Sequence, residues 1–162
     1  WDHFMSHFQT PVDRSSNHPG IIKKQNLIYF THPVFSLYKQ YGNRIYKEMV
    51  SSAIELLLDQ PRIIHSNLPS TARVTILQQP GKNREIIHLL HYIPERRAEN
   101  LDIIEDIIPL CHIELEIKLT GPLKQVYLAP QQQTLKYQNV NEKSIKINID
   151  RVDGHQMIVL EY

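Results

Sequence analysis

Apolar and polar residues alternate with a period of two along three stretches in the second half of the chain. In 111–119, isoleucine and leucine alternate with charged residues and histidine, and 143–149 and 157–161 follow the same pattern. Successive side chains of a β-strand point to opposite faces, so each stretch predicts a strand with one buried face. Gly-Pro at 121–122, Pro130 and Asp153-Gly154 supply the turns between them.

From Arg62 onward the pattern predicts strands only. We expect seven of them, at Arg73–Gln79, Arg84–Tyr92, Cys111–Leu119, Gln125–Leu128, Thr134–Gln138, Lys143–Ile149 and Met157–Glu161. Seven short strands at this spacing predict an antiparallel β-sandwich of two sheets over residues 66–162. The one long connection, 93–109, fits a crossover between the two sheets, with a short helical turn at Ala98–Asp102.

The stretch Arg84–Tyr92 is almost entirely apolar or aromatic and lies between turn-forming residues. A run of this kind is typical of a strand that is buried on both faces, at the centre of a sheet. His88 and His91 are three positions apart, so they should point to opposite faces and cannot share a ligand. We expect His88 to be a hydrogen-bonded histidine of the core.

A helical period replaces the strand period in the first part of the chain. A short helix is predicted over Val34–Tyr41, ending at Gly42, and Asn43 can cap the next helix, Arg44–Leu58. Apolar residues of that helix recur at positions i, i+3, i+4, i+7, i+8 and i+11 and form one stripe: Tyr46, Met49, Val50, Ala53, Ile54 and Leu57.

Before these helices, Asn26–Thr31 has the continuous apolar character of a parallel strand that is covered on both faces. A strand followed by a helix is half of an α/β layer, and one strand cannot cover the stripe of the helix. Residues 1–65 are therefore predicted to be the terminal part of an α/β domain whose earlier strands are missing. The absence of these earlier strands should leave apolar surface of the first part of the chain exposed and favour self-association.

Composition narrows the range of functions. The 162 residues are 41% hydrophobic and 22% charged, as in globular proteins, and a net charge of +1 without a basic cluster argues against a nucleic-acid partner. No segment approaches the roughly 18 apolar residues of a membrane helix.

The single cysteine, Cys111, excludes an intrachain disulfide and a multi-cysteine metal site, and its apolar neighbours predict a buried side chain. The chain begins at Trp1 without methionine, which we interpret as a piece of a longer polypeptide whose compartment its first residues do not reveal.

Few residues suggest chemistry. His3 and His7 have the spacing of a metal-binding pair on a helix, but the aromatic residues between and beside them favour packing. Glu114 and Glu116 share a strand face at roughly the separation of glycosidase carboxylates, although a solvated face is expected for them. Four tyrosines are candidates for a sugar-stacking platform: Tyr92, Tyr127, Tyr137 and Tyr162. The chain has no Gly-x-Ser-x-Gly and no glycine-rich phosphate loop, so we expect no cofactor.

Several phrases of the sequence are similar to a known family. Trp1–His7 with Pro11, and then Leu27–Phe35, resemble the end of the trimerisation domain of β-galactosidase-type glycoside hydrolases, and Tyr38–Leu58 resembles its last helix. Further phrases resemble the small C-terminal β-sandwich of the same enzymes: Leu68–Ala72, His88–Tyr92, Gly121-Pro122, Val126–Leu128 and Arg151–Glu161.

The resemblance implies a structural role. In that family the trimerisation domain has a flavodoxin-like α/β fold, similar to a glutamine amidotransferase but without that activity. The two catalytic glutamates lie on an upstream barrel and match no residue of this chain. The chain would then be a non-catalytic C-terminal accessory and oligomerisation fragment, whose partners are the parent's barrel and further copies of itself. His7 and His32 are the candidates for an oligomer contact or an active-site rim.

Two other functions stay open at this point. The chain could be a stand-alone carbohydrate-binding β-sandwich, which predicts an exposed row of tyrosines. It could also be a hydrolase that uses its own histidines or glutamates, which requires a pocket around Glu114 or Glu116. We expect neither a metal nor a membrane among its partners.

Overall fold

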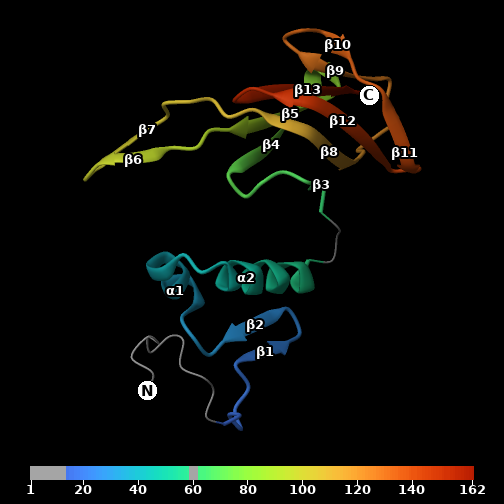
Figure 1. The fold of residues 1–162 in the computed structure, drawn as a ribbon. Coiled ribbons are helices and arrows are strands. Elements are labelled where there is room, and N and C mark those ends of the chain that lie inside the picture. Colours follow the sequence, from blue (N-terminus) through green and yellow to red (C-terminus); the bar gives the residue numbers. More distant parts are fainter. Residues whose placement is uncertain (1–13, 59–61) are drawn as a thin grey trace. The chain divides into compact units, whose positions relative to one another are not determined.

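The computed structural model of the chain describes residues 14–58 and 62–162. By contacts the chain divides into two compact units, Trp1–Pro61 and Arg62–Tyr162. The described residues are mostly β-strand with two α-helices, which confirms the predicted mainly-β class with an α/β portion at the N-terminus (Figure 1). The boundary predicted between residues 65 and 66 falls inside β3 (Ile64–Ser66), a strand of the second unit.

The first unit consists of a hairpin followed by two helices: β1 (Ile21–Lys24), β2 (Leu27–Phe30), α1 (Val34–Tyr41) and α2 (Arg44–Leu57). Both helices lie where the sequence predicts them. Gly42 ends α1 in the left-handed region at φ 63°, and the Asn43 side chain caps α2 by accepting a hydrogen bond from the Ile45 amide at 3.0 Å. No helix in the described part of the chain is long and apolar enough to cross a membrane.

The prediction of a parallel strand at 26–31 was wrong. β2 pairs antiparallel with β1, from Ile21 opposite Phe30 to Lys24 opposite Leu27. The tight turn at Gln25, with φ 50°, brings the two strands together, and β1 was not predicted because its residues include two adjacent lysines. The apolar character of β2 therefore does not reflect two covering layers, since Leu27 and Tyr29 are exposed.

The second unit is a sandwich of two antiparallel sheets (Figure 1). Five strands form one sheet in the order β10-β9-β13-β5-β4, and four form the other in the order β11-β12-β8-β3. The bounds of the strands in the first sheet are β10 (Gln133–Thr134), β9 (Gln125–Ala129), β13 (His155–Glu161), β5 (Arg84–His91) and β4 (Ala72–Gln79). A short 3-10 helix, Pro80–Lys82, joins β4 to β5. Besides β3, the second sheet contains β11 (Tyr137–Asn141), β12 (Ser144–Val152) and β8 (Leu110–Lys118).

The core lies between these sheets and follows the period-two pattern. Its buried residues include three from β8, three from β12 and two from β13: Ile113, Leu115, Ile117, Ile145, Ile147, Ile149, Ile158 and Leu160. The alternation predicted for these three strands is confirmed. Burying side chains from both inner faces supplies the main stabilisation of a sandwich.

Two segments of the sandwich differ from the prediction. The strand expected at 134–138 is interrupted, because β10 pairs with β9 in one sheet and β11 pairs with β12 in the other. The chain crosses between the sheets at 135–136, where the Leu135 amide donates to the Val126 carbonyl at 2.9 Å. The helical turn expected at Ala98–Asp102 was also wrong: β6 (Glu95–Ala98) and β7 (Leu101–Ile103) form an exposed hairpin that extends away from the sheets (Figure 1).

β5 is buried on one face, whereas the sequence predicted burial on both. Glu85, Ile87, Leu89 and His91 are buried, and the residues between them are half-buried or exposed. The strand is interior to its sheet, between β13 and β4, but its outer face has no covering layer among the described residues of the unit. The prediction that this strand is buried on both faces was therefore wrong.

Candidate functional site

A hydrophobic groove of about 390 Å³ lies between the hairpin and α2 in the first unit. The hairpin contributes Ile21 and Phe30, and α2 contributes the remaining lining residues, which are Ile45, Glu48, Met49, Ser52, Ala53 and Leu56. We call it the α2 groove. Ile45 and Leu56 are each 62% exposed, which is unusual for large apolar side chains on one helix face.

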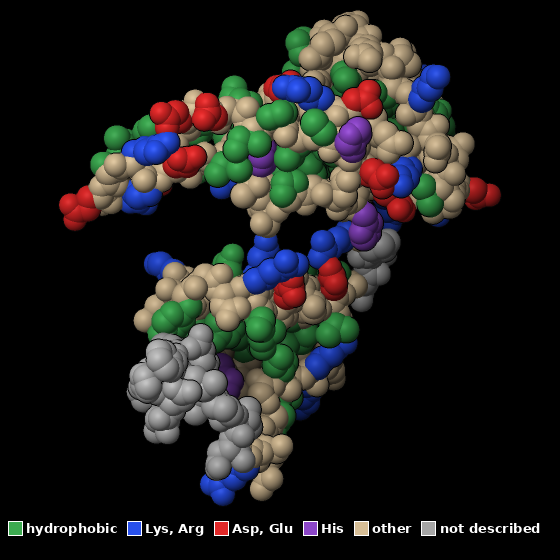
Figure 2. Space-filling view, in the orientation of Figure 1, with side chains coloured by type: hydrophobic (Ala, Val, Ile, Leu, Met, Phe, Trp, Pro, Cys, Tyr) green, Lys and Arg blue, Asp and Glu red, His purple; other side chains and the backbone are tan. Residues whose placement is uncertain are grey.

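This groove adjoins the predicted apolar stripe of α2 and shares Met49 and Ala53 with it. Of the other members of the stripe, Tyr46, Val50 and Leu57 are half-buried, whereas Ile54 is exposed. Phe35 on α1 and Leu27 and Tyr29 on β2 are also well exposed, and Figure 2 shows hydrophobic side chains gathered over this unit. A wide apolar surface on a helix is ordinarily buried over most of its width, so the first unit lacks part of its covering.

His32 lies in the connection between β2 and α1, and its side chain is exposed. Its carbonyl accepts a hydrogen bond from the Val34 amide at 2.8 Å, which helps to start α1. His7 and the His3–His7 pair lie outside the described residues. Within the described residues, no group of three or more His, Cys, Asp or Glu side chains is arranged to hold a metal ion.

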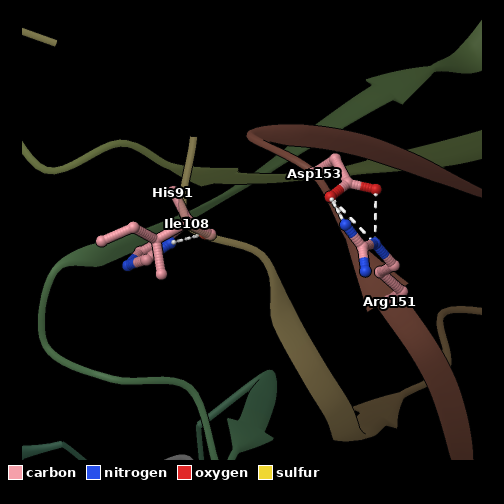
Figure 3. Close-up of polar contacts among 4 residues, drawn as sticks. All are labelled: His91, Ile108, Arg151 and Asp153. Carbon is pink, nitrogen blue, oxygen red and sulfur yellow. Dashed lines mark hydrogen bonds and ion pairs between the residues drawn. The ribbon is translucent and has the colours of Figure 1, made fainter. Parts of the chain in front are cut away.

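His91 is the buried histidine of β5. Its Nδ1 lies 3.1 Å from the Ile108 carbonyl oxygen (Figure 3). Its Nε2 lies 3.0 Å from the Thr71 hydroxyl. Because a carbonyl only accepts, Nδ1 carries the proton and donates it. His91 thereby attaches the 93–109 connection to the sheet, which is a structural role.

His88 lies on the outer face of the same strand and is half-buried, so the prediction of a core histidine was wrong for His88 and describes His91 instead. Its Nδ1 lies 3.0 Å from Nε2 of His155, and the two rings stack with centroids 5.3 Å apart. The opposite faces of His88 and His91 are confirmed. The pairing with His155 was not predicted, because the two residues are 67 positions apart and meet only through the β13–β5 pairing.

Arg151 and Asp153 form an exposed ion pair at the turn between β12 and β13 (Figure 3). The Arg151 Nε donates to both carboxylate oxygens, at 2.9 and 2.8 Å. This hydrogen bonding lowers the pKa of Asp153 below its ordinary value. The pair orders a turn. The prediction of a buried Cys111 was wrong: Cys111 lies opposite Arg151 in the pairing of β8 with β12, faces outward and is exposed.

The two candidate catalytic carboxylates face outward. Glu114 forms an ion pair with Lys146 of β12 at 2.8 Å, and the Glu114 side chain is more than half exposed. Glu116 lies one step along the same face, opposite Lys146 in the pairing with β12 and opposite His65 in the pairing with β3. A solvated face of this kind matches the expectation for both residues.

The four tyrosines do not form a platform. The Tyr162 hydroxyl donates to Glu85 at 2.6 Å in the interior, and the Tyr127 hydroxyl donates to Glu161 at 2.9 Å. Burial, and then the hydrogen bond to Glu85, raises the pKa of Tyr162 to about 12, and burial with the Glu161 hydrogen bond also raises the pKa of Tyr127. Tyr92 packs beneath Gly154, so Tyr137 is the one exposed member of the four.

Comparison with solved structures gives a match over nearly the whole chain. No protein-family model matches the chain, and no curated protein matches it in sequence. Among solved structures, α-L-fucosidase isoenzyme 2 from Paenibacillus thiaminolyticus aligns with 98% of this chain at a TM-score of 0.87 and 33% sequence identity. A cycloisomaltooligosaccharide glucanotransferase from Paenibacillus sp. aligns with 67% of the chain and 19% of its own length, at a TM-score of 0.43 and 15% identity, too weak a likeness to support an inference.

The alignment with the fucosidase covers very different shares of the two chains. The chain spans 24% of the length of the fucosidase, yet both of its units are included in the alignment. The prediction of a relation to glycoside hydrolases is thus confirmed, while the narrower assignment to the β-galactosidase type stays a prediction. The chain is therefore related to a glycoside hydrolase over nearly its whole length, and it corresponds to about a quarter of that enzyme.

Proposed function

We propose that this chain is a non-catalytic accessory and oligomerisation portion of a longer glycoside hydrolase. The observation that carries the proposal is the exposed α2 groove. It lies in a chain that aligns over nearly its whole length with about a quarter of an α-L-fucosidase. In the parent protein, the remaining strands of the α/β domain cover the groove. In the isolated chain, a second copy is the available apolar partner.

The outward carboxylates support the absence of catalysis in this portion. Glycosidases place two carboxylates on opposite sides of a bound sugar, and one of them must be held protonated by its surroundings. Glu114 is instead paired with Lys146 in solvent, and neither Glu114 nor Glu116 lines the α2 groove. The catalytic acids of the parent then belong to the part of the polypeptide outside this chain.

Two substrate classes follow for the parent. The 33% identity to an α-L-fucosidase supports an α-L-fucoside. The resemblance of the sequence phrases to β-galactosidase-type enzymes supports a β-galactoside. A stand-alone sugar-binding sandwich is less well supported, because two of the four tyrosines that it needs are buried.

Sedimentation velocity and activity measurements on the whole chain test this proposal. We expect concentration-dependent self-association, and Leu56→Glu should weaken it by placing a charge in the α2 groove. Ser36→Glu is the matched control, because it adds the same charge at an exposed polar position of α1. The chain should hydrolyse neither p-nitrophenyl α-L-fucoside nor p-nitrophenyl β-D-galactoside.

Hydrolysis of either glycoside by the purified chain would overturn the non-catalytic role. A chain that stays monomeric at all concentrations would overturn the role of the α2 groove in association. Far-UV circular dichroism of each variant separates lost association from lost folding, and Ile45→Glu, on the same groove, provides a second variant.

A further inference from the structure

The sandwich has a second groove at one open edge of the space between its sheets. It has a volume of about 560 Å³ and is lined by Leu119, Thr120, Gly121, Pro122, Leu123, Tyr137, Asn139, Glu142 and Lys143. We call it the Tyr137 groove. Its size lies within the usual range for small-molecule sites, roughly 300–1,000 Å³.

The strand register explains why polar groups face this groove. Tyr137 lies opposite Ile147 and Asn139 lies opposite Ile145 in the β11–β12 pairing, so both share the inward face of the sheet with core residues. β11 is the edge strand, however, and Tyr137 remains 39% exposed while Asn139 is exposed. Side chains aimed at the core thus border a solvent-filled hollow.

The walls of the groove are held in place by hydrogen bonds and packing. The Leu119 amide donates to the Lys143 carbonyl at 2.7 Å, which joins the end of β8 to the β11–β12 turn. The Lys143 amide donates to Oδ1 of Asn141 at 2.8 Å and fixes the turn itself. Leu119 and Leu123 both pack against the core, so the loop between them is anchored at each end. A preformed site loses less conformational entropy when a ligand binds.

The chemistry of the lining selects a class of ligand. Across the residues that the structure describes, the side chains of Asn139, Glu142 and Lys143 have no hydrogen-bond or ion-pair partner within the chain. They present an amide, a carboxylate and an ammonium group beside the exposed ring of Tyr137. We propose that the Tyr137 groove binds a neutral sugar residue, with the pyranose ring stacked on Tyr137 and its hydroxyls bonded to these three side chains.

Other ligand classes fit less well. One negative and one positive side chain give the groove no net charge, and it contains no arginine, so it lacks the basic surplus that a phosphate or sulfate needs. A purely apolar ligand would remove Glu142 and Lys143 from water without replacing their hydrogen bonds. A pyranose has one apolar face of C–H groups and a rim of hydroxyls that both donate and accept, which matches a ring beside mixed polar groups.

This binding role goes beyond the architectural function proposed above and does not depend on it. The test is a ¹H–¹⁵N NMR titration of the whole chain with methyl β-D-glucopyranoside and methyl β-D-galactopyranoside, and with glucose 6-phosphate as the charged comparison. We expect saturable shifts confined to the amides of 119–121, 123 and 137–143 with at least one neutral glycoside, with weaker binding of the phosphate.

Variants connect the shifts to the groove. Tyr137→Ala should weaken binding about tenfold, because it removes the stacking surface. Tyr38→Ala is the matched control, since Tyr38 on α1 is 42% exposed and lies in the other unit. If Tyr137→Ala unfolds, Asn139→Ala and Glu142→Gln test the same groove and should each weaken binding several-fold.

Three results would overturn the sugar site. They are the absence of saturable shifts in the groove with either neutral glycoside, equal affinity of wild-type protein and all groove variants, and tighter binding of glucose 6-phosphate than of the neutral sugars. None of them would affect the proposed accessory function, because that proposal is tested by the association of the first unit and by the α2 groove.

Discussion

Replacing Tyr162 by phenylalanine removes one hydroxyl group from the interior of the sandwich. That hydroxyl donates to Oε2 of Glu85 at 2.6 Å, and the two residues are 8% and 6% exposed. The other carboxylate oxygen accepts from Nε2 of Gln78 at 2.9 Å. The substitution therefore leaves Glu85 buried with one of its two side-chain hydrogen bonds, while the aromatic ring can keep its packing.

The expected cost follows from this geometry. A hydrogen bond to a carboxylate contributes about 1.5–3 kcal/mol, and a buried acceptor that loses its donor keeps its desolvation penalty. We expect the free energy of unfolding to fall by about 2 kcal/mol. For a unit of this size the midpoint of thermal unfolding should fall by roughly 8–16 °C.

Urea unfolding at pH 7, followed by far-UV circular dichroism, measures this change. Tyr137→Phe is the control: it removes a hydroxyl of an exposed tyrosine and should leave the free energy of unfolding nearly unchanged. If Tyr162→Phe and Tyr137→Phe have the same stability, the buried hydrogen bond contributes nothing and the reasoning is wrong.

Alkaline pH gives the same hydrogen bond a second test. Tyr162 has a pKa of about 12 in the folded protein against an ordinary value of 10.0, so folding favours the protonated form. The stabilisation is complete below pH 10 and is lost as the pH rises to about 12. It amounts to roughly 2–3 kcal/mol, because each unit of difference between the folded and unfolded pKa corresponds to about 1.36 kcal/mol. Tyr162→Phe should lose less stability than the wild type over this range. An identical alkaline loss in both proteins would assign the effect to other groups, among them Tyr127.

Three further substitutions test the fold. Gly154→Ala should lower the free energy of unfolding by about 2 kcal/mol or more, because Gly154 has φ 71° and an added Cβ would lie 2.6 Å from Cζ of Tyr92. Gly20→Ala is the control, because an added Cβ there would have nothing within 4 Å. Equal stabilities of the two variants in urea would refute the clash. Ser144→Ala should raise the free energy of unfolding by up to about 1 kcal/mol, because the buried Ser144 hydroxyl has no hydrogen-bond partner in the part of the chain that the structure describes. A loss of stability in this variant would show that the hydroxyl has a partner. Asn43→Ala should destabilise α2 by about 1 kcal/mol, seen as reduced ellipticity at 222 nm during urea titration, and an unchanged titration would show that the cap contributes nothing.

The strands with strict alternation could be located from the sequence. Ile113, Leu115 and Ile117 are buried as predicted, because a period of two allows only one face of a strand to reach the core. The helices α1 and α2 were also located correctly, since Gly42 and Asn43 supply local signals for their ends. These predictions succeeded because the information lies within a few neighbouring residues.

The candidate sites could not be found in this way. His88 meets His155 through strand pairing across 67 positions, and the sequence gives no sign of that register. The α2 groove combines residues of the hairpin with residues of α2 beside and within the predicted stripe, and the hairpin was not foreseen because a single parallel strand was expected there. The Tyr137 groove requires the break between β10 and β11, where a single strand was expected.

The sequence by itself determined which faces are apolar, and so the mainly-β class, the two helices and the membership of the sandwich core. Hydrophobic periodicity encodes these features locally, because burial of each apolar side chain is favourable whatever its partner. Only the tertiary structure decided which apolar faces find a partner within the chain. The outer face of β5 and the α2 groove are both rich in apolar side chains, yet each remains uncovered within its own unit, because the described strands and helices of that unit do not reach it.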